Sequence, residues 1–225
     1  MSMPFYVAPE QFMKDKADYA RKGIARGRAL VAAVFDAGIV LAAENPSTNL
    51  HKISEIYDRI AFAGVGRYNE FDQLRVAGIQ HADMKGYQYS REDVDARALA
   101  NLYAQHLGLV FTHEAKPFEV EILVAEVSSS PEEDQLFHVL YDGTVSDETN
   151  FSALGGDSDA IGERMTESFA AGWSLTDALK ATVTALAGPE RTLVAADLEV
   201  AVLDRVAPRR AFRRLADGEV ESLLA

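Results

Sequence analysis

The sequence predicts an α+β protein in which two antiparallel sheets face each other and helices cover both outer faces, a four-layer α-β-β-α sandwich with an extra N-terminal helix. Two observations indicate this arrangement. After a first helix, segments alternate in blocks of strands, two helices, strands, two helices and strands. No linker, repeat or low-complexity segment divides the chain, so residues 9–225 are expected to form one domain behind a tail of residues 1–8.

The first block combines a helix with two predicted hairpins. The helix is expected from Pro9 to about Arg26, because proline suits a first helical turn and Gly27 is a typical terminator. Two apolar strands are predicted in RALVAAVFDAGIVLAAEN, joined by a turn at residues 36–38. Two more are predicted in HKISEIYDRIAFAGVG, joined near residues 57–59. Hairpin order among these four strands predicts an antiparallel sheet.

Two helices are predicted next, from apolar residues at helical spacing. The first carries Phe71, Leu74, Val76, Ile79 and Met84. The second is expected to begin at Ser90, where SRED places a carboxylate three residues after a capping hydroxyl. Its apolar stripe comprises Leu99, Leu102, Tyr103, His106, Leu107 and Val110. On this stripe, His106 is expected to pack in the core.

The C-terminal half repeats the pattern. Strands are predicted in FEVEILVAEV, LFHVLYD and FSALGG, with the polar loop SSSPEEDQ between the first two. One helix then carries Ile161, Met165 and Phe169, and the next opens with SLTD, a second capping-box sequence. DLEVAVLDR and AFRRLA are predicted as the last strands, and GEVESLLA as a short final helix.

Composition narrows the possible functions. The formal net charge of −13 argues against nucleic acid as a partner, because phosphate binding needs a basic surface. The chain has no cysteine, which excludes disulfides and thiolate metal sites. It shows no membrane-length apolar run and no secretory signal pattern, so a cytoplasmic protein without a membrane partner is expected.

Three further motifs favour ordinary structural roles. No histidine pair forms HxxxH or HExxH, so neither a metal site nor another cofactor is expected. LGGDSD, at residues 154–159, lacks the Lys-Ser/Thr of a phosphate loop and predicts a tight turn into a helix capped by Asp157 or Ser158. The carboxylate cluster PEED, at residues 131–134, is expected to be a solvated turn.

Several segments, taken in order, resemble one family. PFYVAPEQ and YARKGIARG are similar to the start of α-type proteasome subunits, and KISEIYDRIAFAGVG to their lysine-led hairpin. LEVAVLDR followed by PRRAFRRL resembles the C-terminal strands of actinobacterial α subunits. The resemblance spans essentially the whole chain and places it in the N-terminal-nucleophile hydrolase superfamily. Many relatives carry a longer acidic tail than this chain, which stops at Ala225.

The resemblance implies a non-catalytic α subunit of a bacterial 20S proteasome core particle. Seven copies would form each outer ring, in contact with neighbouring α subunits and with peptidase β subunits, and unfolded protein substrates would pass through. A hexameric ring ATPase or another activator would dock through its C-terminal tails. Lys52, Gly27 and Arg26 are the residues expected to receive a tail. Lys52 would pair with the tail carboxylate, and Gly27 would allow close approach.

A gate at the ring entrance is implied for the apolar N-terminal tail. Its residues would be Met1, Ser2, Met3, Pro4, Phe5, Tyr6, Val7 and Ala8. Pro9 and Tyr19 match positions that stabilise the open gate in the family. The simpler alternative is a frayed terminus without a gating role.

The main alternative is an active, self-processing hydrolase of the same fold. Such an enzyme needs a nucleophile at the start of its first strand, with its own α-amine as the base. Here that strand begins near Arg28, in mid-chain, and Ser2, Thr48 and Thr144 do not open it. Lys52 then has no nucleophile to assist, and a catalytic role for it is not expected.

Two plainer interpretations also stay open. Lys52 is compatible with a simple surface role, and the chain with an oligomeric scaffold that lacks peptidase partners. A local basic cluster is compatible either with an anionic partner or with a solvated helix face. Its members are Arg21, Lys22, Arg26 and Arg28.

Overall fold

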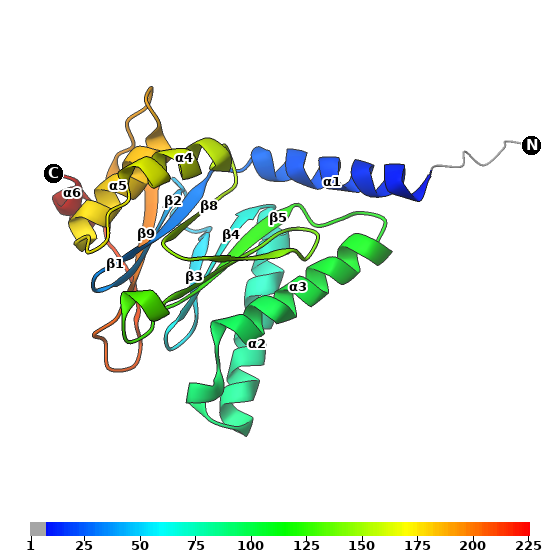
Figure 1. Ribbon diagram of the computed structural model, residues 1–225, viewed down its shortest axis with the longest axis horizontal. Helices are drawn as coiled ribbons and strands as arrows, with labels where there is room; N and C mark the ends of the chain where they lie inside the picture. Colours follow the sequence, from blue (N-terminus) through cyan, green and yellow to red (C-terminus); the bar gives the residue numbers. More distant parts are fainter. Residues whose placement is uncertain (1–7) are drawn as a thin grey trace, which may run out of the picture.

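The computed structural model describes residues 8–225, and its elements follow the predicted order of blocks (Figure 1). The first part contains α1 (Pro9–Ala25), β1 (Leu30–Phe35), β2 (Gly38–Glu44), β3 (Ile53–Tyr57), β4 (Ile60–Gly66) and α2 (Tyr68–Gln88). The middle contains η1 (Arg91–Asp93), α3 (Ala96–His113), β5 (Val120–Glu126), η2 (Pro131–Glu133), β6 (Gln135–Val139), β7 (Val145–Glu148) and β8 (Phe151–Leu154). The last part contains α4 (Ser158–Ser168), α5 (Leu175–Ala187), η3 (Ala195–Asp197), β9 (Leu198–Asp204), β10 (Phe212–Arg214) and α6 (Asp217–Leu224).

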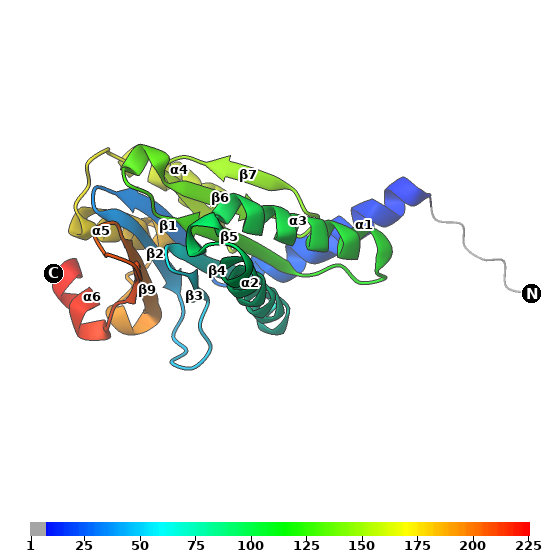
Figure 2. The same ribbon diagram turned by 90° about the horizontal axis from the view of Figure 1, so that it is seen from below.

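Two five-stranded antiparallel sheets form the middle layers. Their orders are β10-β9-β2-β1-β8 and β3-β4-β5-β6-β7. The two N-terminal hairpins are therefore divided between the sheets and do not form one sheet together, so the segment at residues 45–52 crosses from one sheet to the other. β7, with the polar sequence VSDE, was not predicted; it pairs only with β6, at the edge of its sheet (Figure 2).

Helices cover both outer faces, which confirms the four layers (Figures 1 and 2). On one face, α4 and α5 pack through Met165 and Leu179, and on the other α3 packs through Tyr103 and Leu107. A third core lies between the sheets. It includes Leu30, Leu41, Ile53, Leu123 and Leu136, all fully buried. Removing these apolar side chains from water is the main driving force for the sandwich.

The second helix of the middle block begins later than predicted. Ser90 does form a capping box with Asp93, whose carboxylate accepts from the Ser90 N–H at 3.0 Å, but this box caps only η1. α3 is capped instead by Asp95, which accepts from the Ala98 N–H at 2.8 Å. The other predicted capping box, SLTD, does begin α5, where the Asp177 N–H donates to the Ser174 hydroxyl at 3.2 Å.

The apolar stripe predicted for α2 is partly wrong. Val76 and Met84 are 39% and 60% exposed, because the small residues Gly78 and Ala82 face the core in their place. A close approach between α2 and its neighbours requires small side chains, and hydrophobic spacing alone does not reveal it.

Two predictions about polar residues are also wrong. His106 is exposed, and its ring lies 5.9 Å from that of Phe118 on the surface of α3. PEED is not a wholly solvated turn, because the Asp134 side chain is fully buried and pairs with Arg205 at 2.7 and 2.8 Å. The expected tight turn in LGGDSD is present, with φ of +67° at Gly155 and +53° at Gly156.

Candidate functional site

Lys52 lies just before β3, at the point where α1 ends and β1 begins. Its ammonium nitrogen, Nζ, donates to the main-chain oxygen of Arg28 at 2.6 Å. Arg28 follows Arg26 and Gly27 directly in the chain. Lys52 therefore lies next to the segment that holds Arg26 and Gly27, the other two residues that the resemblance implies for tail binding.

The environment of Lys52 makes its protonated form less stable than that of a solvated lysine. Burial of the side chain lowers the lysine pKa from 10.5 to about 8; Glu199 and Glu44 oppose this shift and Arg28 adds to it. Burial disfavours the charged form of any group, and neighbouring carboxylates favour a cation. A further carboxylate placed beside Lys52 would stabilise its protonated form.

Gly27 is tightly packed between the end of α1 and β4. A Cβ added there would lie 3.0 Å from the Ile24 carbonyl oxygen and 3.2 Å from a Val65 methyl group. Only a residue without a side chain fits this approach of the end of α1 to β4 comfortably. Because glycine has no side chain, none of its own atoms covers the main chain at residue 27. The neighbouring Arg26 is exposed.

A pocket of about 410 Å³ adjoins this junction and is lined in part by Gly27 and Arg28. Lys52 does not line the pocket but is hydrogen-bonded to Arg28. Glu44 lies in its wall and pairs with Arg28 at 3.6 Å and with Arg191 at 3.1 Å. The ionisable lining residues are Arg28, Glu44, Asp157, Arg164, Glu190 and Arg191. Three arginines face three carboxylates, so the pocket lacks the acidic excess of the chain as a whole.

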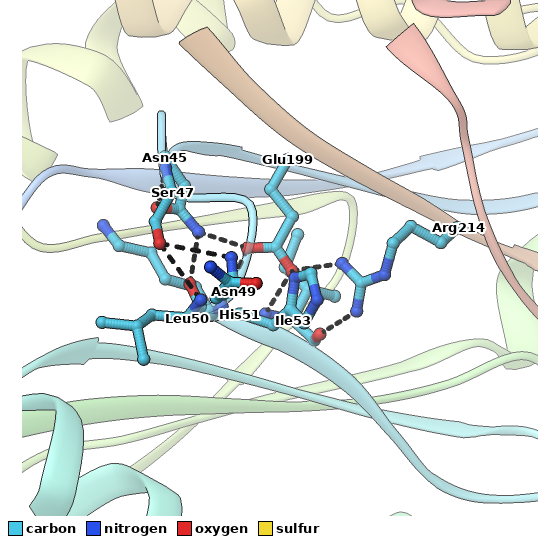
Figure 3. Close-up of polar contacts among 9 residues, drawn as sticks. Asn45, Ser47, Asn49, Leu50, His51, Ile53, Glu199 and Arg214 are labelled. Carbon is cyan, nitrogen blue, oxygen red and sulfur yellow. Dashed lines mark hydrogen bonds and ion pairs between the residues drawn. The ribbon is translucent and has the colours of Figure 1, made fainter. Parts of the chain in front are cut away.

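Sequence reasoning missed Glu199 on β9, a buried residue that is hydrogen-bonded to the main chain of Lys52 (Figure 3). Its carboxylate is buried and accepts the main-chain N–H of Lys52 at 2.8 Å. It also contacts the side chains of Asn45 and Arg214. The available signal was a charged residue inside the apolar strand sequence LEVAVLD.

The structure describes only some of the residues predicted to form the gate. Residues 1–7, from Met1 to Val7, lie outside the described part of the chain. Ala8 and Pro9 are exposed at the start of α1. Tyr19, ten residues after Pro9 in the same helix, is 48% exposed. The Lys116 ammonium group lies 5.7 Å from the centre of the Tyr19 ring.

The positions of two of the three candidate nucleophiles do not suit a hydrolase, and the third, Ser2, lies outside the described residues. Thr48 lies in the segment that crosses between the sheets, and Thr144 in the turn before β7. β1 begins at Leu30 and is preceded by α1. Within residues 8–225, no cluster of three or more His, Asp or Glu side chains is arranged to hold a metal ion. In that same span, no helix is both long enough and apolar enough to cross a membrane.

Comparison with known proteins gives matches to proteasome subunits that together extend over the whole chain. The family model for proteasome subunits matches residues 24–202. A proteasome subunit alpha of Acidimicrobium ferrooxidans is 65% identical over 224 residues, which cover 100% of this chain and 97% of the relative. Those of Sanguibacter keddieii and Xylanimonas cellulosilytica are 59% and 58% identical, covering 100% and 96% of this chain and 90% and 93% of the relatives.

Two facing sheets enclosed by helices, with a further helix before the first strand, define a subunit of the N-terminal-nucleophile hydrolase fold. The matches show that the chain belongs to the proteasome subunit family. Within it, the chain is of the α type, the non-catalytic subunit of a core particle whose complex is a threonine protease. The prediction of a non-catalytic α subunit is therefore confirmed, and the alternative of a self-processing hydrolase is set aside.

Proposed function

We propose that this subunit forms the heptameric outer rings of a cytoplasmic 20S core particle. In each ring, residues 9–225 contact neighbouring copies and the β subunits, while the tail of residues 1–8 controls the passage of unfolded protein. The high identity to α subunits over the full chain supports this role. Docking of a hexameric ring ATPase, or another activator, through its C-terminal tails is the second part of the proposal.

The hydrogen bond from Lys52 to the Arg28 carbonyl carries the docking proposal. A carboxylate is a stronger acceptor for an ammonium group than a neutral carbonyl, so a tail carboxylate can take over this bond. At about 4 Å and an effective dielectric near 20, the attraction is roughly 4 kcal/mol before desolvation is subtracted. One tail should therefore bind weakly, and several tails on one activator gain through effective concentration.

The gating proposal rests on the sequence of the tail and on the direction of α1. The first turns of α1 project away from the sandwich (Figure 1), and Pro9 is exposed at their start. Tyr19, further along the helix, is 48% exposed. Apolar tails from seven copies would meet at the ring axis, where packing against each other would remove them from water.

Substitution of Lys52 by alanine tests the docking proposal. In core particles assembled with the β subunit, Lys52→Ala should reduce ATPase-stimulated protein degradation to the level without ATPase, because the tail carboxylate loses its cation. Cleavage of a small fluorogenic peptide by the β subunit should stay unchanged. Lys180→Ala, which removes an exposed lysine from α5, is the matched control. Full stimulation of the Lys52→Ala particle would disprove the docking role.

A further inference from the structure

Glu199 is a buried carboxylate that connects one sheet to the segment that carries Lys52. It lies on β9 and is 6% exposed. One carboxylate oxygen accepts from the Lys52 main-chain N–H at 2.8 Å and from the Asn45 side-chain amide at 2.7 Å. The other accepts from the Ile53 N–H at 3.2 Å. A buried carboxylate is tolerated only when its oxygens are paired. The three N–H groups named above all belong to residues 45–53.

Arg214, on β10, completes the connection from the other side (Figure 3). Its guanidinium group contacts the Glu199 carboxylate and donates to the Ile53 carbonyl oxygen at 2.7 Å. Ile53 is thus held at its N–H by Glu199 and at its carbonyl by Arg214. The start of β3 takes its position from the opposite sheet as well as from its own partner, β4.

The loop ahead of Lys52 is anchored to the same carboxylate. Besides its bond to Glu199, the Asn45 amide donates to the Leu50 carbonyl oxygen at 2.8 Å, and its side-chain oxygen accepts from the Ser47 N–H at 3.2 Å. The Ser47 hydroxyl accepts from the Leu50 N–H at 3.1 Å. The side chains of Asn45 and Ser47 thereby pair with main-chain N–H and C=O groups of this loop, and the bond to Glu199 connects the loop to β9.

The same carboxylate contributes to the electrostatic balance at Lys52. Glu199 and Glu44 favour the charged lysine, whereas burial and Arg28 disfavour it. Both carboxylates also contact other ionisable side chains. His51 lies 3.3 Å from Glu199, and Arg191 pairs with Glu44. Without Glu199, Lys52 would keep its burial and lose the carboxylate that opposes it most strongly.

We propose that Glu199 is a positioning residue for activator docking, which fixes the main chain of Lys52 so that its ammonium group is presented beside Arg28 to a tail carboxylate. Glu199 is too buried to contact the tail and acts through Lys52. The inference rests on the proposed docking function of Lys52.

The variant Glu199→Gln tests this role with little change in size. A glutamine offers one acceptor oxygen and places an NH2 group where the second oxygen stood, so it cannot accept from both sides. Asp134→Asn is the matched control, because it weakens another buried arginine–carboxylate pair, Asp134–Arg205, beyond the opposite end of β9. Lys52→Ala reports on the docking proposal itself.

Each variant is assembled with the β subunit, and its thermal unfolding midpoint is recorded. The probe is a fluorescent peptide with a free C-terminal carboxylate that copies the tail of the ring ATPase used in the degradation assay, and its amidated form is the blank. Fluorescence polarisation gives the dissociation constant between about pH 7 and pH 9.5, the range that includes the lysine transition.

Glu199→Gln should weaken peptide binding about tenfold or more, and the loss of affinity on raising the pH should begin at a lower pH than in the wild type. Asp134→Asn should leave affinity and pH profile at wild-type values even where it lowers the unfolding midpoint equally. An effect of Glu199→Gln no larger than that of Asp134→Asn would overturn the inference.

Two further comparisons keep the outcomes separate. If Lys52→Ala binds the peptide normally, the docking proposal itself fails. If Lys52→Ala loses binding while Glu199→Gln retains it, only the positioning role fails. Should Glu199→Gln not assemble, Asn45→Ala decides, since it removes one bond to Glu199 and leaves the charge; it should weaken binding several-fold, and wild-type affinity would refute the inference.

Discussion

At the scale of single residues, Lys52 is a cation whose charge is only marginally stable. Its burial lowers the pKa to about 8, within reach of ordinary buffers, while a solvated lysine stays charged to above pH 10. A tail carboxylate binds the protonated form, so the bound complex has a higher lysine pKa than the free site. Binding therefore takes up a proton once the pH exceeds about 8.

Tail binding should accordingly fall as the pH rises. Below about pH 8 the free site is already protonated and affinity should be constant. Above it, the dissociation constant should rise by up to about tenfold per pH unit until the lysine pKa of the bound state is reached. Titration of a labelled tail peptide on assembled particles measures this. Lys52→Arg, which keeps its charge throughout, should show no such loss; a wild-type affinity that is flat to about pH 9.5 would contradict the prediction.

At the scale of elements, the α2–α3 layer depends on a close approach at Gly78. A Cβ there would lie 1.7 Å from the hydroxyl oxygen of Tyr103, a fully packed residue of α3. Among the described residues, this hydroxyl has no hydrogen-bond partner, and burial raises its pKa. The tyrosine ring packs against Phe62 with its centroid 5.7 Å away and is 1% exposed, so a shift of the ring would disturb its neighbours in the core.

Gly78→Ala should therefore destabilise the chain, by about 1–3 kcal/mol, because the added methyl group forces the two helices apart. Gly162→Ala is the matched control within a helix, since nothing lies within 4 Å of an added Cβ there. It should leave stability unchanged or increase it by about 0.5–1 kcal/mol through the lower entropy of the unfolded chain. Urea unfolding of the purified subunit compares the two, and equal effects would contradict this packing argument.

The elements were predictable where their own sequences carry the signal. Apolar strands with short turns, as in RALVAAVFDAGIVLAAE, and the capping box at Ser174 were located correctly because both signals are local. β7 was missed because its sequence, VSDE, has no apolar pattern and its pairing is imposed by β6. The burial of Asp134 was missed for a similar reason, since its partner Arg205 is 71 residues away.

At the scale of the whole molecule, the fold brings the proposed docking residues together from distant segments. The resemblance to α subunits indicated Lys52, Gly27 and Arg26, and the Lys52–Arg28 bond places them at one junction. Glu199 and Arg214 were not predicted, because they meet the segment of Lys52 across 147 to 161 residues of sequence. Nothing local marks a charged strand residue as the anchor of another strand.

The direction of α1 extends this argument to the assembled ring. Its C-terminal half packs on the sandwich through Ala20 and Ile24, which lie against Tyr141, whereas Pro9 is exposed at the projecting end (Figure 1). The end of α1 to which the tail of residues 1–8 is joined therefore lies away from the sandwich. If the ring forms as proposed, we expect the apolar residues 1–8 of the seven copies to meet in a shared space.

Deletion of residues 2–8 should therefore open the core particle. The rate of cleavage of a fluorogenic peptide by particles assembled with the β subunit should rise several-fold without an activator, because the apolar plug is gone. Lys180→Ala particles, in which the tail is intact and an exposed lysine on α5 is removed, should keep the low wild-type rate and serve as the control. Thermal unfolding of the deleted subunit should be unchanged, since α1 is anchored by residues such as Ile24. Peptide entry at the wild-type rate after the deletion would refute the gate.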